Sequence, residues 1–195
     1  MSTYAIVLFL HFLGLIGLFV GYGLEWVASS LLRRAASTEQ ARSWLRVYRV
    51  SLPISGPALL LLILTGGHLA SMGIGFKQGW ILASIVAIVV ALFIGFVLIL
   101  PRVRAIRGAL PEGNVDLPAE ALARLQAPVF VTLVRVRFLL ALGIVYLMTA
   151  KTSLNTSLLI LLGAMVVGVI VSIPSWSRPA AKYRARAVMQ TKDEE

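Results

Sequence analysis

The chain has 195 residues, of which 59% are hydrophobic, and its mean hydropathy is +0.91. A soluble domain cannot bury this much apolar surface, whereas a membrane protein exposes it to lipid. The absence of cysteine excludes disulfides, thiolate metal sites and cysteine nucleophiles. The net charge of +10 does not indicate nucleic acid, because the basic residues flank apolar stretches, where anionic lipid headgroups attract each of them by about 1 kcal/mol.

Five apolar stretches are expected to cross the membrane as helices, at residues 4–26, 53–72, 80–100, 129–150 and 156–173. About 20 helical residues, rising 1.5 Å each, are enough to cross a hydrocarbon core of about 30 Å. The predicted fold is therefore an all-α membrane bundle with five transmembrane helices. Residues 1–175 form its single domain, and the basic tail at 176–195 is expected to be disordered.

The basic residues are sorted to one side of these stretches. Only Lys77 and Lys151 lie in the second and fourth connectors. The other 16 of the 18 Lys and Arg residues lie in the first connector, in the third connector and the start of the fourth stretch, and in the tail: Arg33, Arg34, Arg42, Arg46, Arg49, Arg102, Arg104, Arg107, Arg124, Arg135, Arg137, Arg178, Lys182, Arg184, Arg186 and Lys192. Because basic connectors stay in the cytoplasm, we expect the N-terminus outside, the C-terminus inside, and a multi-pass protein of the bacterial inner membrane.

The first stretch carries a face of small residues, Gly14, Gly17 and Gly21. Gly17 and Gly21 have the spacing of a GxxxG motif, which lets a neighbouring membrane helix approach closely. We therefore expect another helix to pack against this face.

The first connector predicts an amphipathic surface helix at residues 38–50, started by Ser37 as N-cap with Gln40 three residues later. One face is apolar and the other is basic, a pattern typical of a helix that lies among lipid headgroups. Arg42, Arg46 and Arg49 are the predicted lipid-facing basic residues. A solvated linker is the alternative. In both cases the second span is expected to begin at Pro53, with Pro53 and Pro57 near its first turn, where proline is tolerated.

The fourth stretch must take charged residues into the membrane. Its uncharged part, residues 138–150, is too short to cross alone, so the helix has to include Arg135 and Arg137. Two positions apart, they point to nearly opposite helix faces, so one would extend to the headgroups and the other would face the bundle. Glu25 is the only acidic residue in any span. We expect a structural ion pair between Glu25 and one of these arginines, with a proton pathway as the alternative.

Two histidines are the candidate cofactor ligands. His11 and His68 lie about 10 Å and about 7 Å below the outer ends of their helices, at a similar level of the membrane. They could hold the iron of a b-type haem, and Gly14, Gly66 and Gly67 beside them would make room for a flat macrocycle. With Met72, four residues after His68, they could instead bind a metal such as copper(I). A structural hydrogen bond between helices, or proton handling, is the alternative.

Several short motifs resemble one family. They are Leu10-His-Phe-Leu-Gly14, Gly56-Pro-Ala-Leu-Leu with Leu64-Thr-Gly66, Trp80, Pro101 with its following arginines, and Val145-Tyr-Leu-Met-Thr-Ala-Lys151. Together they resemble the bacterial predicted integral membrane proteins of domain-of-unknown-function 2269. The likeness covers residues 4–151, so the fifth span looks like an addition. The resemblance implies a membrane fold and no particular reaction.

The first span is also distantly similar to the membrane protoporphyrinogen oxidases of the HemJ type and to the copper-resistance membrane proteins of the CopD type. That similarity implies haem or copper near His11. The part of His68 as a second ligand comes only from its depth in the membrane.

Three kinds of function follow from these residues. The first is a small membrane protein that binds b-type haem for a redox or haem-related role, the second is a cofactor-free structural or assembly protein, and the third is a small transporter. The spans lack the broken helix pairs and polar midplane typical of transporters. The chain has no nucleotide-binding glycine loop, no Ser/His/Asp set and no paired carboxylates, so the sequence indicates no catalytic residue. The expected partners are the lipid bilayer and its anionic headgroups, and a second copy or another membrane protein.

Overall fold

The computed structural model describes residues 2–111, 113 and 117–176, and these residues form helices joined by short connections. In chain order the elements are α1 (Thr3–Leu32), α2 (Thr38–Leu69), the π-helical turn η1 (Ala70–Ile74), α3 (Gly79–Phe93), the π-helical segment η2 (Ile94–Ile99), α4 (Leu100–Gly108), α5 (Ala119–Gln126), α6 (Pro128–Ala150) and α7 (Leu154–Trp176). The predicted tail at 176–195 lies almost entirely outside the described residues, so its expected disorder stays a prediction.

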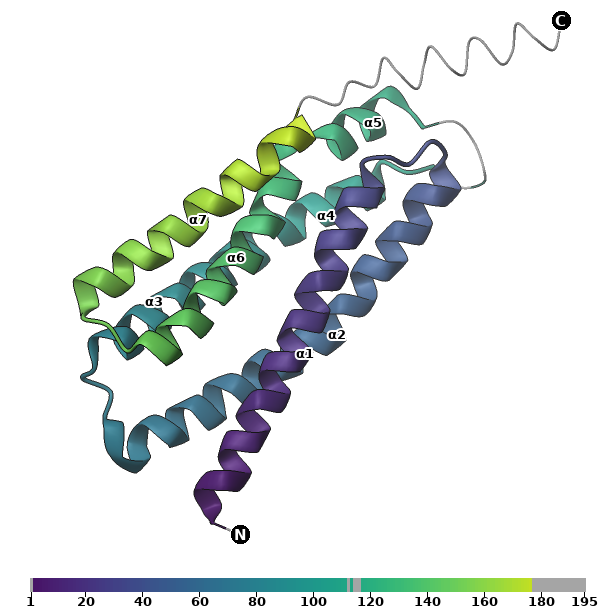
Figure 1. The fold of residues 1–195 in the computed structure, drawn as a ribbon. Coiled ribbons are helices and arrows are strands. Elements are labelled where there is room, and N and C mark those ends of the chain that lie inside the picture. Colours follow the sequence, from purple (N-terminus) through teal and green to yellow (C-terminus); the bar gives the residue numbers. More distant parts are fainter. Residues whose placement is uncertain (1, 112, 114–116, 177–195) are drawn as a thin grey trace, which may run out of the picture.

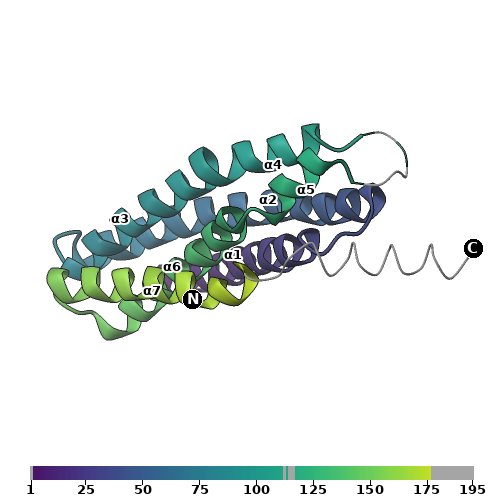
Figure 2. The same ribbon diagram turned by 90° about the horizontal axis from the view of Figure 1, so that it is seen from above.

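Within the part of the chain that the structure describes, five helical segments are long and apolar enough to cross a membrane: Thr3–Leu32, Thr38–Met72, Gly79–Gly108, Ala119–Ala150 and Leu154–Trp176. The predicted all-α bundle with five spans is thus confirmed. Figure 2 shows that α3, η2 and α4 follow one another as a nearly continuous rod, which accounts for the third span.

The helix α6 lies at the centre of the bundle. It packs along α7 and also contacts α1 and α3, while α1 packs along α2 (Figure 1). In the most apolar part of its span 56% of the residues are buried, against 22% in the spans of α1 and α7. The helix that carries two arginines into the membrane is therefore the one best shielded from lipid.

The two ends of the bundle differ in charge. The α1–α2 connection, α4 and α5 lie together at one end, whereas the turn after η1 and the α6–α7 turn lie at the other (Figure 1). The second end contains Lys77 and Lys151. The first end contains the arginines of the described connectors, so the charge sorting read from the sequence corresponds to two separate ends of the molecule. Its orientation across the membrane stays a prediction.

The predicted small-residue face of α1 packs directly on α2. A Cβ atom on Gly21 would lie 2.6 Å from the Cβ of Ser55, and one on Gly17 would lie 2.9 Å from the Cβ of Ala58. Real Cβ atoms do not come this close, so the interhelical separation requires glycine at these positions.

The separate surface helix expected at residues 38–50 is not present, because α2 runs without a break from Thr38 to Leu69 and includes Pro53 and Pro57. The predicted cap is present: Ser37 accepts a hydrogen bond from the Gln40 N–H at 3.3 Å. The apolar face expected to meet headgroups instead packs in the protein core, with Ala41, Leu45 and Tyr48 buried. The physical reason is that α1, α4 and α6 offer this face a protein surface, and membrane helices continue through proline when neighbouring groups stabilise them.

Candidate functional site

The site is an ion pair inside the bundle that joins α1 to α6. Arg137 donates a hydrogen bond to Oε2 of Glu25. The side chains are deeply buried, since Glu25 is 1% exposed and Arg137 is 7% exposed. Ser51 on α2 adds a third helix: its Oγ lies 3.2 Å from Oε1 of Glu25 and 2.6 Å from the carbonyl oxygen of Tyr48. The single hydroxyl proton therefore serves one of these two acceptors at a time.

The guanidinium group of Arg137 is held from two further directions. Its central carbon lies 4.4 Å from the ring centre of Tyr22, a distance at which a cation is attracted to the ring face. On η2, a Cβ atom on Gly95 would fall in the space that the guanidinium occupies. We therefore define the charge cluster as Glu25, Arg137, Ser51, Tyr22 and Gly95. The last three were not predicted from the sequence, although Tyr22 lies one helical turn before Glu25 and so shares its face.

Arg135 turns away from the charge cluster, as the spacing of two residues predicts, but it does not extend to the headgroups. It is 9% exposed, and its Nη1 donates to the carbonyl oxygen of Val171 on α7 at 2.8 Å. Its guanidinium carbon also lies 5.3 Å from the ring centre of Trp26. The expectation of an extended arginine is corrected because α7 and Trp26 cover this face of α6. Of the two arginines, Arg137 is the one beside Glu25.

The structure places His11 in the contact between α1 and α2, where it is 8% exposed. Its Nδ1 lies 2.9 Å from Oγ1 of Thr65. That hydroxyl also lies 2.6 Å from the carbonyl oxygen of Leu61, which can only accept a hydrogen bond. When the single hydroxyl proton of Thr65 is donated to Leu61, Thr65 accepts from Nδ1–H of His11 and Nε2 of the neutral ring carries the free electron pair; in the other tautomer Thr65 donates to Nδ1.

The other predicted ligands do not join His11 in a buried site. His68 is exposed on α2, and Met72 is 48% exposed. Two of the three glycines expected to leave space are covered, since Gly14 packs against Leu62 and Gly66 packs against the ring of His11 itself. Nothing lies within 4 Å of a Cβ atom placed on Gly67. Within residues 2–111, 113 and 117–176, no group of three or more His, Cys, Asp or Glu side chains is arranged to hold a metal ion.

The charge cluster is buried, contains ionisable groups and holds several helices against one another. It connects α1, α2 and α6, and η2 closes over it, so the two charges neutralise each other where lipid and protein exclude water. Ionisable groups at membrane depth are costly and are retained for folding or for function.

The fold and this cluster together define a multi-pass integral membrane protein with an intramembrane ion pair. The model of the family described as "Predicted integral membrane protein (DUF2269)" matches residues 5–152, and the chain belongs to this family. The match ends just before α7, in keeping with the resemblance drawn from the sequence motifs. No curated protein and no solved structure matches the chain.

Proposed function

We propose that the protein is a structural or assembly component of the bacterial inner membrane, with its N-terminus outside and its basic end in the cytoplasm. One observation supports this proposal above all: among the described residues of the spans, the buried acidic, arginine and histidine side chains each interact with another helix of the same chain. Glu25 and Arg137 bind each other, Arg135 binds α7, and His11 binds Thr65. Polar groups that pair between helices in this way stabilise the packing of a bundle, and these side chains are then not needed to bind a substrate.

A second candidate function is the binding of a b-type haem by His11, and the arrangement in which Thr65 accepts from Nδ1–H favours it. Histidines that ligate iron commonly donate their other ring N–H to a fixed acceptor, which sets the ring orientation. Thr65 provides such an acceptor for Nδ1, and Nε2 keeps the electron pair that ligation needs. Against this, Gly14 and Gly66 are filled by helix packing, so the donor atom fits and the space beside it does not. A bound haem would supply one-electron redox chemistry.

One experiment separates the two candidates. The protein is purified from cells supplied with a haem precursor, and absorbance spectra are recorded in oxidised and reduced states. A structural protein gives no haem band above that of a membrane-protein control, and no stoichiometric metal by elemental analysis. A stoichiometric band that is lost in His11→Ala and kept in His68→Ala would establish haem ligation and refute the structural proposal.

A further inference from the structure

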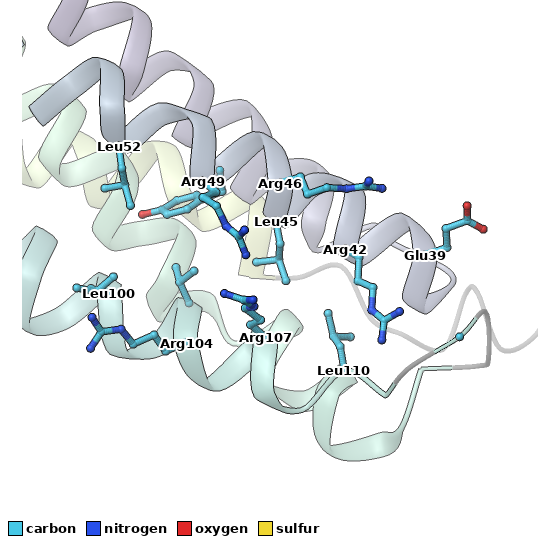
Figure 3. A pocket seen from close by; sticks show the side chains of 13 residues that line it. Glu39, Arg42, Leu45, Arg46, Arg49, Leu52, Leu100, Arg104, Arg107 and Leu110 are labelled. Carbon is cyan, nitrogen blue, oxygen red and sulfur yellow. The ribbon is translucent and has the colours of Figure 1, made fainter.

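A groove with five arginines lies between the N-terminal half of α2 and α4. Its volume is about 1080 Å³, and Arg42, Arg46 and Arg49 from α2 and Arg104 and Arg107 from α4 line it (Figure 3). In the described part of the chain, Glu39 is the one carboxylate in its wall. The positive charge is thus concentrated in a hollow between two helices instead of being spread over a solvated surface.

Three of these arginines lack a partner within the described residues. No hydrogen bond or ion pair links Arg49, Arg104 or Arg107 to another described group, whereas Arg42 donates to the carbonyl oxygen of Pro111 and Arg46 donates to Ser43. Arg49 and Arg107, from different helices, point toward one another across the groove (Figure 3). Two like charges that face each other repel, and an anion between them reverses the sign of the interaction.

The groove also has an apolar end. Leu45 and Tyr48 are buried in its wall, and Leu52 and Leu100 lie at the end nearest the middle of their spans. Because α2 runs from this end of the bundle into the membrane and α4 runs out of it, Leu52 and Leu100 lie deeper than the arginines. A ligand that complements both the arginines and the apolar end of the groove has an anionic group joined to a hydrocarbon chain.

The length of the helices places the arginines at the level of the headgroups. The span Thr38–Met72 has 35 residues, which at 1.5 Å each extend about 50 Å, well beyond a hydrocarbon core of about 30 Å. The span Gly79–Gly108, with 30 residues, is also longer than the core requires. Both helices therefore project several turns past the hydrocarbon at their basic ends, where phospholipid phosphates lie.

We infer that the groove between α2 and α4 is a binding site for one anionic phospholipid, its phosphate held between Arg49 and Arg107 with Arg104 beside them, and an acyl chain along Leu52 and Leu100. Arginine suits this task because its planar guanidinium binds phosphate oxygens with two parallel hydrogen bonds. The inference rests on the proposed placement of the basic end at a headgroup layer, and it adds one defined site to a general attraction for anionic lipid.

The test measures lipid binding by the full-length protein in detergent, using native mass spectrometry. Phosphatidylglycerol is titrated against phosphatidylcholine with the same acyl chains. We expect one retained phosphatidylglycerol, and about tenfold weaker binding in the variant R49Q/R107Q. The matched control R34Q/R124Q removes two charges from the same end of the bundle but outside the groove, and we expect its affinity to stay within about twofold of the unchanged protein.

The variant R49K/R107K keeps both charges and is expected to retain most of the binding. A loss of binding that occurs only in R49Q/R107Q therefore shows that the charges in the groove bind the lipid, and that the loss is not caused by unfolding. If R49Q/R107Q gives no folded protein, R104Q alone replaces it, with an expected loss of about threefold. The melting temperatures of all variants are compared, so that destabilisation of the helix bundle is distinguished from a loss of lipid binding.

Three results would overturn the inference. One is equal binding of the two lipids, or equal loss in R49Q/R107Q and R34Q/R124Q, which would mean that only diffuse charge attraction exists. Another is displacement of the lipid by millimolar inorganic phosphate, which would make the groove a site for a free anion. The last is binding that appears only after Asp193→Asn, Glu194→Gln and Glu195→Gln are combined, which would make the acidic end of the chain the natural occupant.

Discussion

Arg137 on α6 donates to the carboxylate of Glu25 on α1, and the two residues are separated by 112 positions in the chain. The pair fixes the rotation of α6 relative to α1, because only one face of α6 can present Arg137 to Glu25. It also explains how the most buried helix of the bundle accommodates a charge.

The first prediction concerns the cost of breaking this pair. Glu25→Gln or Arg137→Gln leaves the other charge buried without compensation, and each is expected to destabilise the bundle by about 3–5 kcal/mol. The double variant E25Q/R137Q removes both charges and should cost clearly less than the sum of the two single changes. Thermal melting of the purified protein in detergent measures all three, with the exposed-site variant Arg34→Gln as the control.

Additive losses in this double-mutant cycle would show that the two side chains do not interact, whatever their separation in the structure. The same series includes Arg135→Gln, which loses a hydrogen bond to Val171 but leaves no carboxylate unpaired. We expect its effect to be smaller, about 1–3 kcal/mol, since the change leaves no charge buried without its counter-ion.

The sequence predicted a Glu25–arginine pair because the spans offer a single acid, yet it did not decide between Arg135 and Arg137. Two residues on opposite faces of a helix are distinguished only by how that helix is rotated in the bundle, and the rotation depends on α7 and Trp26. For the same reason the contributions of Ser51 and Gly95 were missed. Each becomes visible only once two helices are paired.

The second prediction tests the close contact of α1 and α2. Gly21→Ala places a methyl group where Ser55 lies, and the strain should cost about 1–3 kcal/mol. Gly23→Ala, two residues along the same helix, meets nothing within 4 Å and should be neutral or stabilise by up to about 1 kcal/mol, because alanine favours a helix more than glycine does. Melting curves of the two variants give the comparison. A similar loss in both would mean that backbone effects, and not helix contact, govern this face.

The continuity of α2 shows where a local pattern reaches its limit. An apolar face opposite a basic face describes both a helix among headgroups and a helix whose apolar side packs on protein. The sequence of residues 38–50 favoured the first, and the second span was expected to begin separately at Pro53. The structure has the second, since Leu45 and Tyr48 pack in a core that also contains Leu32 and Phe130. The identity of the surface that covers a helix face is a property of the whole fold.

The third prediction concerns the contact of His11 with Thr65. Thr65→Val keeps the shape of the side chain but removes the acceptor for Nδ1–H, and a lost hydrogen bond between membrane helices costs about 1 kcal/mol. Thr149→Val is the control, because Thr149 is exposed and its hydroxyl bonds only within its own helix. We expect lower melting temperature in the first variant and no change in the second. Unchanged melting in both would show that the buried imidazole does not depend on Thr65.

The fourth prediction tests the orientation that the arginines imply, and the absence of native cysteine makes it direct. Single cysteines are introduced by Phe76→Cys, Asn155→Cys and Ala123→Cys, at exposed positions that leave every charge in place. In intact cells a membrane-impermeant maleimide should label the first two, which lie at the end of the bundle that contains Lys77 and Lys151 and lacks the arginines. Ala123→Cys on α5 should react only after the membrane is opened, because basic connectors stay in the cytoplasm. Labelling of Ala123→Cys in intact cells, with protection of the other two, would reverse the orientation. It would then place the arginine groove at the outer leaflet.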